Sequence, residues 1–208
     1  MKKKSWICSI VLVLTTLSTF AQENSQEFYD NGNLRSEGQL LNGEKEGEWK
    51  FYYPDGSLNT LESYKMGLLN GKLKTYDREG NLIALENWLE GIEEDSSISY
   101  YSNGQVKRAG VFEGGLYEGQ WSSWYESGQI KSIGNYVLGK PDGFWEFWNE
   151  QGVKTYEGYY KAGIENGHWK FFDKKGNLEF EGEMKDGERV GEWKVYTSKG
   201  KVKRTVVY

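Results

Sequence analysis

Residues 153–176 read VKTYEGYYKAGIENGHWKFFDKKG, and they contain every feature of a unit that recurs along the chain with a period of 24 residues. Within this stretch Gly158, Tyr160, Gly163, Gly167 and Trp169 form the pattern Gly-x-aromatic-x-x-Gly-x-x-x-Gly-x-Trp. The stretch ends in one of eight glycines spaced 24 residues apart, which are Gly32, Gly56, Gly80, Gly104, Gly128, Gly152, Gly176 and Gly200. A fixed period of this length is the signature of a repeat architecture.

Two columns of large residues keep the same period. Four residues before each of those glycines stand Phe28, Tyr52, Tyr76, Tyr100, Trp124, Trp148, Phe172 and Tyr196. Eight residues after them stand Leu40, Tyr64, Trp88, Phe112, Tyr136, Tyr160, Met184 and Tyr208. Three columns in register predict one array over residues 28–208.

Each unit predicts two short strands. Residues 47–58 read GEWKFYYPDGSL, in which alternating aromatic residues favour a strand and the Asp55-Gly56 step favours a hairpin turn. The chain lacks sustained helical periodicity. A lone hairpin is marginally stable, so neighbouring hairpins must supply the buried surface. We therefore expect an all-β, elongated array of stacked antiparallel β-hairpin repeats, with residues 201–208 as a last strand.

The N-terminal residues predict an export signal. Lys2, Lys3 and Lys4 precede an uncharged, largely apolar run over residues 6–20, and small residues at Thr19 and Ala21 suit cleavage. An uncut membrane anchor is the alternative, although the run is short for a span of about 20 residues. The predicted organisation is a signal peptide at 1–21, a short polar lead-in at 22–27 and the array at 28–208. The mature protein would be periplasmic or secreted.

Composition excludes several classes of function. Cys8 is the only cysteine and lies in the predicted signal, so the mature chain would have neither disulfides nor thiol chemistry. Cleavage would remove three lysines and no acid, which changes the net charge from -5 to about -8. Nucleic-acid binders present a concentrated basic face, and an acidic chain is repelled by anionic lipid. We expect no nucleic-acid partner and disfavour membrane binding.

The unit resembles the MORN repeat in its bacterial 24-residue variant, and the chain is similar to the YwqK-type antitoxin family over essentially all of residues 28–208. The units that begin after Gly32, Gly104, Gly128, Gly152 and Gly176 match fully, except that Leu40 and Met184 occupy the aromatic position. The resemblance implies a ribbon of β-hairpins that binds proteins, lipids or membranes. It carries no catalytic residues.

The residues that could act in catalysis or bind a metal are interpreted as solvent-exposed loop residues. His168 is the only histidine, and it occupies a variable position between Gly167 and Trp169. Glu90, Glu93, Glu94 and Asp95 cluster near Glu86, where paired carboxylates could hydrolyse a glycosidic bond or bind Ca²⁺. The alternating acids of a calcium loop are absent, and a charge run is usually solvated. We expect no enzyme activity, metal or cofactor.

One aromatic row is a candidate binding surface. Trp49, Phe51 and Tyr53 point to one side of their strand, and Tyr52 points to the other. The row of Tyr52, Tyr76, Tyr100, Trp124 and Trp148 is thus either an exposed stacking surface or a second buried row. Residues 57–99 also depart from the pattern, because Leu73 and Ser97 replace Trp and Asp95 replaces Gly. This region adds Trp88, Glu90, Glu93, Glu94 and Asp95 to the candidate residues.

The predicted function is a non-catalytic scaffold for protein–protein interaction in the cell envelope or outside the cell, antitoxin-like by resemblance. The main alternative is glycan or cell-wall binding through exposed aromatic residues. A hydrolase that uses the acidic residues is a third, weaker interpretation, because a ribbon offers few clefts.

Overall fold

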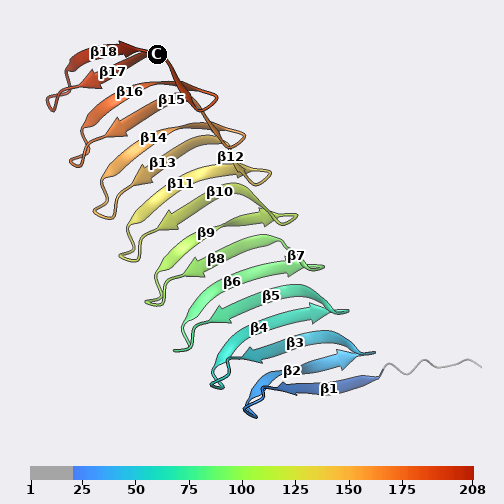
Figure 1. Ribbon diagram of the computed structural model, residues 1–208. Helices are drawn as coiled ribbons and strands as arrows, with labels where there is room; N and C mark the ends of the chain where they lie inside the picture. The colour runs from blue at the N-terminus through green and yellow to red at the C-terminus, as the bar shows by residue number, and fades with distance from the viewer. Residues whose placement is uncertain (1–20) are drawn as a thin grey trace, which may run out of the picture.

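The protein is a single antiparallel β-sheet built from hairpins that stack along one direction (Figure 1). The computed structural model describes residues 21–208 and contains no helix within them. The strands are β1 (Gln22–Phe28), β2 (Leu34–Leu41), β3 (Glu44–Tyr52), β4 (Leu58–Lys65), β5 (Leu68–Tyr76), β6 (Leu82–Leu89), β7 (Ile92–Glu93), β8 (Asp95–Tyr100), β9 (Val106–Glu113), β10 (Leu116–Trp124), β11 (Ile130–Val137), β12 (Lys140–Pro141), β13 (Gly143–Trp148), β14 (Lys154–Lys161), β15 (Ile164–Phe172), β16 (Leu178–Lys185), β17 (Glu188–Tyr196) and β18 (Val202–Val207). The predicted all-β array of stacked hairpins is confirmed.

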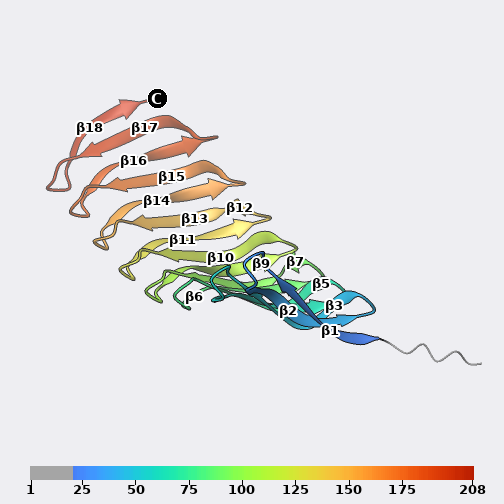
Figure 2. The same cartoon turned by 60° about the horizontal axis from the view of Figure 1, so that its bottom comes forward.

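Strands that follow one another in sequence are neighbours in the sheet. The short strands β7 and β12 are the first parts of interrupted strands, since β6 also pairs with β8 and β11 with β13. The sheet is one layer thick and twists along its length, so that its N-terminal strands overlap one another in Figure 2 while its C-terminal strands are spread out. Both faces of the sheet are therefore uncovered over the described residues.

Glycines set the turns at both sides of the ribbon. At the Asp-Gly and Asn-Gly turns the glycine adopts a positive φ, as at Gly56 (90°), and its N–H donates to the carbonyl three residues earlier. On the opposite side Gly47 has a φ of 72°, and Asp95, which replaces glycine there, takes a φ of 68°. Such angles are costly for a residue with a Cβ. The period of 24 residues is thus the length of two strands and two glycine turns.

The sequence predicts features at both ends of the chain, namely a signal peptide and a lead-in at the N-terminal end and a last strand at the C-terminal end. The signal peptide predicted for residues 1–21 lies outside the described residues, apart from Ala21. The lead-in predicted at residues 22–27 is not a separate segment, because it forms β1 together with Phe28 and pairs with β2. Residues 202–207 form the expected last strand. Within residues 21–208 no helix is long and apolar enough to cross a membrane.

The core is a row of tryptophans that lie on glycines. In five units the indole ring covers a glycine eleven residues earlier, in the pairs Gly38–Trp49, Gly110–Trp121, Gly134–Trp145, Gly158–Trp169 and Gly182–Trp193. A Cβ on Gly158 would lie only 2.2 Å from the Trp169 ring, so only glycine admits the indole at this depth. The five tryptophans are 1 to 6% exposed although the sheet has one layer.

Each indole is also anchored by a hydrogen bond. The Nε1–H of Trp145 donates to the carbonyl of Asn135 at 3.0 Å, and Trp169 donates to Tyr159 at 3.1 Å. The same bond recurs in the other three units. Neighbouring rings cover the indole edge-on, as Tyr160 does for Trp169 at a centroid distance of 5.1 Å. Aromatic burial and a satisfied indole donor together stabilise each hairpin against the preceding one.

The two units that lack tryptophan also lack the glycine. Leu73 follows Glu62 by eleven residues, and Ser97 follows Glu86 by the same interval. Both glutamates occupy the glycine position on the core face of the sheet, where Glu62 accepts a hydrogen bond from Thr60 at 2.7 Å and Glu86 accepts one from Trp88 at 3.1 Å. Tryptophan and glycine are therefore replaced together, as their contact requires.

This contact predicts a strong coupling between Gly158 and Trp169. Gly158→Ala should destabilise the fold by about 1–3 kcal/mol, because the new methyl group overlaps the indole. In a Trp169→Leu background the same change should cost much less, since the smaller side chain leaves room. A double-mutant cycle by urea denaturation, followed by circular dichroism, measures the coupling. Equal costs in both backgrounds would contradict the contact.

Candidate functional site

The two faces of the sheet differ in what they present. The tryptophan face carries Trp49, Trp121, Trp145, Trp169 and Trp193, and the residues adjacent to them in sequence point to the opposite face. The tryptophans are occupied in packing. A binding site must therefore draw mainly on side chains beside them or on the opposite face, with only the edges of the indole rings in reach.

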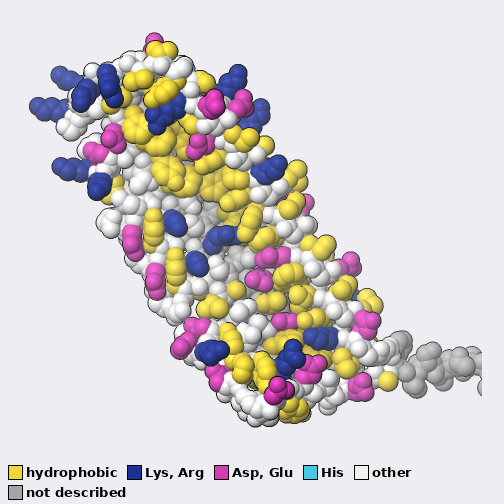
Figure 3. Space-filling view, in the orientation of Figure 1, with side chains coloured by type: hydrophobic (Ala, Val, Ile, Leu, Met, Phe, Trp, Pro, Cys, Tyr) yellow, Lys and Arg dark blue, Asp and Glu magenta, His cyan; other side chains and the backbone are white. Residues whose placement is uncertain are grey.

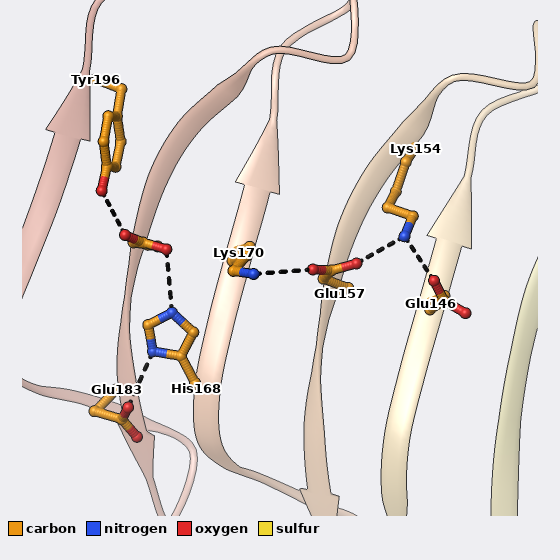
Figure 4. Close-up of polar contacts among 8 residues, drawn as sticks. Glu146, Lys154, Glu157, His168, Lys170, Glu183 and Tyr196 are labelled. Atoms are coloured by element: carbon orange, nitrogen blue, oxygen red, sulfur yellow. Dashed lines mark hydrogen bonds and ion pairs between the residues drawn. The ribbon is translucent and has the colours of Figure 1, made fainter. Parts of the chain in front are cut away.

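The opposite face holds a ladder of polar contacts near the C-terminal end (Figure 4). His168 places its two ring nitrogens 3.2 Å from Glu181 and 3.0 Å from Glu183, and Tyr196 also donates to Glu181. Lys170 lies 3.4 Å from Glu157, which also contacts Lys154. His168 is partly exposed, and its carboxylate partners join β15 to β16. The arrangement is a set of hydrogen bonds and lysine–glutamate ion pairs that link neighbouring strands.

The predicted aromatic row lies on the opposite face and is neither exposed nor buried. Tyr52, Tyr76, Tyr100, Trp124 and Trp148 are all half-buried. Tyr52 donates a hydrogen bond to Glu37 at 2.8 Å, and burial together with this carboxylate raises the pKa of Tyr52 to about 12. The rings belong to successive hairpins and make no ring–ring contact with one another. They do not form a continuous stacking platform.

The residues of the predicted acidic cluster lie in different environments and make different contacts. Glu94 accepts a hydrogen bond from the backbone N–H of Gly114 at 2.7 Å, as Glu118 does from Leu138 in the next unit at 2.9 Å. Glu90 and Asp95 are exposed and have positive φ. Glu93 lies opposite Trp88 in the β6–β7 pair, and burial raises its pKa. Within residues 21–208 no three His, Cys, Asp or Glu side chains are grouped to hold a metal ion.

A hollow of about 540 Å³ opens on the tryptophan face over strands β8 to β13. It is lined by Ser99, Tyr101, Lys107, Arg108, Trp121, Ser123, Trp124, Lys131, Ser132, Tyr136, Trp145 and Phe147. Figure 3 shows basic side chains gathered in the middle of this face, next to an apolar surface toward the C-terminal end. Its volume falls in the range of ligand sites. Trp124 is the only predicted candidate residue in its lining.

The hollow exists because aromatic filling stops there. Toward the C-terminus Phe147 stacks on Tyr156 at 4.3 Å, and Phe171 stacks on Phe180 at 4.6 Å. The positions equivalent to these rings, in the units before them, are Ser99, Ser123 and Ser132. Ser123 and Ser132 share a hydrogen bond of 2.7 Å. Small hydroxyl residues thus form a floor between aromatic walls.

Three cations surround this floor. Arg108 stacks over Tyr117 at 4.5 Å and over Trp121 at 4.6 Å. Lys107 lies 5.6 Å from the Tyr101 ring, and Lys131 lies 5.5 Å from the Tyr125 ring. All three are exposed, and among the described residues none has a carboxylate within ion-pair distance. The lining contains no acidic residue.

The hollow is a feature that the sequence alone does not predict. Its signal is visible in the repeat columns, because serine stands at 99, 123 and 132 where later units have Phe or Tyr. The basic residues at 107, 108 and 131 fall in the same part of the sequence as those serines. Only the pairing of β9, β10 and β11 shows that these positions face one space.

Comparison with protein families gives a clear match. A family model described as a MORN repeat variant matches residues 24–42, 45–66, 117–137, 165–186 and 189–208, which together make up half of the chain. The unmatched residues 67–116 include Leu73, Asp95 and Ser97, where the repeat pattern is weakest. No curated protein matches the chain.

Solved structures with detectable similarity are much longer chains. The crystal structures of TcdB2-TccC3-TEV, TcdB2-TccC3-Cdc42 and TcdB2-TccC3 match with 12, 13 and 12% identity over 83, 84 and 84% of this chain. The matches cover 12, 13 and 13% of those chains, with TM-scores of 0.23, 0.20 and 0.19. This chain thus spans about an eighth of their length.

The raised pKa of Glu93 predicts a pH-dependent effect on stability. Burial favours the neutral carboxyl group in the fold, with Glu86 adding to the effect, against a hydrogen bond from Ser97 and the charge of Arg108. Below the ordinary value of 4.5, Glu93 is protonated in both the folded and unfolded states. As pH rises through that value and the raised folded-state pKa, ionisation costs stability. Glu93→Gln should therefore stabilise the protein at pH 7, with no gain near pH 4.

Urea denaturation at the two pH values measures this difference. Glu90→Gln is the matched control, because Glu90 is exposed in the adjoining turn. A Glu93→Gln protein that is no more stable than the parent at pH 7 would refute the expectation.

Proposed function

Because the chain belongs to the MORN repeat variant family, whose repeats are generally associated with protein or membrane binding, we propose that it is a non-catalytic scaffold for a protein partner. The observation that carries this proposal is the hollow on an uncovered face of a one-layer sheet. The packing residues that recur from unit to unit form the ribbon, whereas the hollow interrupts that packing with side chains suited to contact a partner.

Charge favours a protein over a membrane as the partner. The net charge of -5 becomes about -8 if the proposed export signal is removed. An anionic lipid surface would repel such a chain as a whole. A protein partner contacts only a local patch of the surface. The residues that line the hollow, and not the net charge of the chain, then determine whether binding is favourable. Tryptophan, tyrosine and arginine, which are enriched at the centres of protein interfaces, all line it.

We further propose that binding takes place outside the cytoplasm. The basic start, apolar run and small residues near Ala21 support export to the periplasm or beyond. An antitoxin-like role would be one form of this function, in which the partner is a toxin present in the same compartment. The repeat packing itself favours no particular partner.

Glycan binding is the alternative that one specific observation favours. On the opposite face, Phe144 and Tyr159 are 41% and 47% exposed, with ring centroids 5.0 Å apart. Exposed ring pairs of this kind suit the apolar face of a sugar. They lie away from the hollow, so the two functions make separable predictions.

Photocrosslinking in the native cell distinguishes the two functions. We expect benzoylphenylalanine at Phe147, which lines the hollow, to form a discrete adduct with a protein. The same replacement at Phe171, the equivalent position one unit later, should not, because Phe171 does not line the hollow. Absence of a protein adduct at Phe147, with glycan retention that is lost in Phe144→Ala, would reject the protein scaffold in favour of the glycan.

A further inference from the structure

We propose that the hollow over β8 to β13 binds a short acidic segment of the protein partner. In this complex, carboxylates would contact Lys107, Arg108 and Lys131, and a neighbouring apolar or aromatic side chain would lie against Trp121, Trp145 and Phe147. The inference rests on the proposed scaffold function and specifies its ligand chemistry.

The cations are held in place by rings rather than by acids. Arg108 also donates a hydrogen bond to the Tyr117 hydroxyl, so its guanidinium plane is fixed over two rings. A fixed guanidinium offers paired donors that match a carboxylate. Lys107 and Lys131, which lie over the rings of Tyr101 and Tyr125, add two charges one hairpin apart. The set is preorganised for anions, which reduces the ordering cost of binding.

Other basic residues of the sheet are not available in this way. Arg35, which occupies the Lys107 position three units earlier, lies 3.9 Å from Glu27. Lys154 and Lys170 have carboxylate partners at 2.6 to 3.4 Å. The cations of the hollow therefore differ from cations that balance acids within the sheet.

The walls and floor match a peptide with both charged and apolar side chains. The serine hydroxyls at 99, 123 and 132 can donate to or accept from a peptide backbone. Phe147 and the tryptophan edges give an apolar wall. A volume of about 540 Å³ accommodates a few side chains and not a folded domain. An extended segment is the occupant that uses all these surfaces.

The acidic surroundings select a short anionic segment over a polyanion. Acids stand close in sequence to the lining residues, with Glu86 and Glu93 on β6 and β7, Glu118 on β10 and Glu126 in the turn that follows β10. Charges interact over about 8 Å at physiological ionic strength, so a nucleic acid, an anionic glycan or a membrane extending past the hollow meets repulsion. A short cluster of Asp or Glu avoids it.

Selection from a random dodecapeptide phage library against the purified full chain tests the inference. We expect enriched peptides to combine Asp or Glu with an aromatic residue. Binding of a synthetic enriched peptide, measured by fluorescence anisotropy, should weaken roughly tenfold or more in Lys107→Glu/Lys131→Glu. The matched control is Lys174→Glu/Lys199→Glu, which makes the same charge change in exposed turns and should leave affinity unchanged. Circular dichroism verifies that both variants fold.

Three outcomes would overturn the inference. One is enrichment without acidic bias, and another is equal affinity in the two double variants. The third is the absence of enriched peptides, whether or not an oligogalacturonate probe binds with the same lysine dependence. None of these alters a protein adduct at Phe147, so failure of the ligand chemistry is distinguishable from failure of the scaffold function.

Discussion

An indole ring resting on a backbone with no side chain beneath it is the contact on which this ribbon depends. A sheet of one layer has no second layer to cover its core. Trp169 solves this problem locally, because Gly158 lets the ring approach the backbone and the Tyr159 carbonyl accepts a hydrogen bond from the indole N–H. Each hairpin is thereby fixed to the one before it. The same contact, repeated, produces a long structure from short-range interactions alone.

The middle of the ribbon shows what happens when this contact is removed. Glu62 and Glu86 occupy the glycine position, and Leu73 and Ser97 occupy the tryptophan position. The strands still pair through their backbones, and Asp95 adopts the positive φ of the glycine that it replaces. Small residues next to this region leave the hollow and its cations open. We interpret the loss of aromatic packing as the change that makes a binding surface possible on an otherwise filled face.

Much of the fold could be predicted from the sequence, and much of the site could not. The glycine at 158 and the tryptophan at 169 are visible as columns, and strand alternation places both on one face, so hairpins and an elongated array follow. The exposure of Tyr52 could not be predicted, because it depends on Glu37 across the strand pair. Glu94 looks like part of an acidic cluster, whereas it binds the backbone of the following turn. The hollow could not be predicted, because it depends on which repeat positions are placed side by side by the pairing of β9, β10 and β11.

Hydrogen exchange along the ribbon measures the central claim most directly. If tryptophan on glycine stabilises each hairpin, amides of β6 and β8, beside Ser97, should exchange faster than those of β14 to β16, around Trp169. Both regions lie away from the ends of the array, so fraying affects neither. Protection that is uniform across these interior strands, or greatest in β6 and β8, would contradict the account.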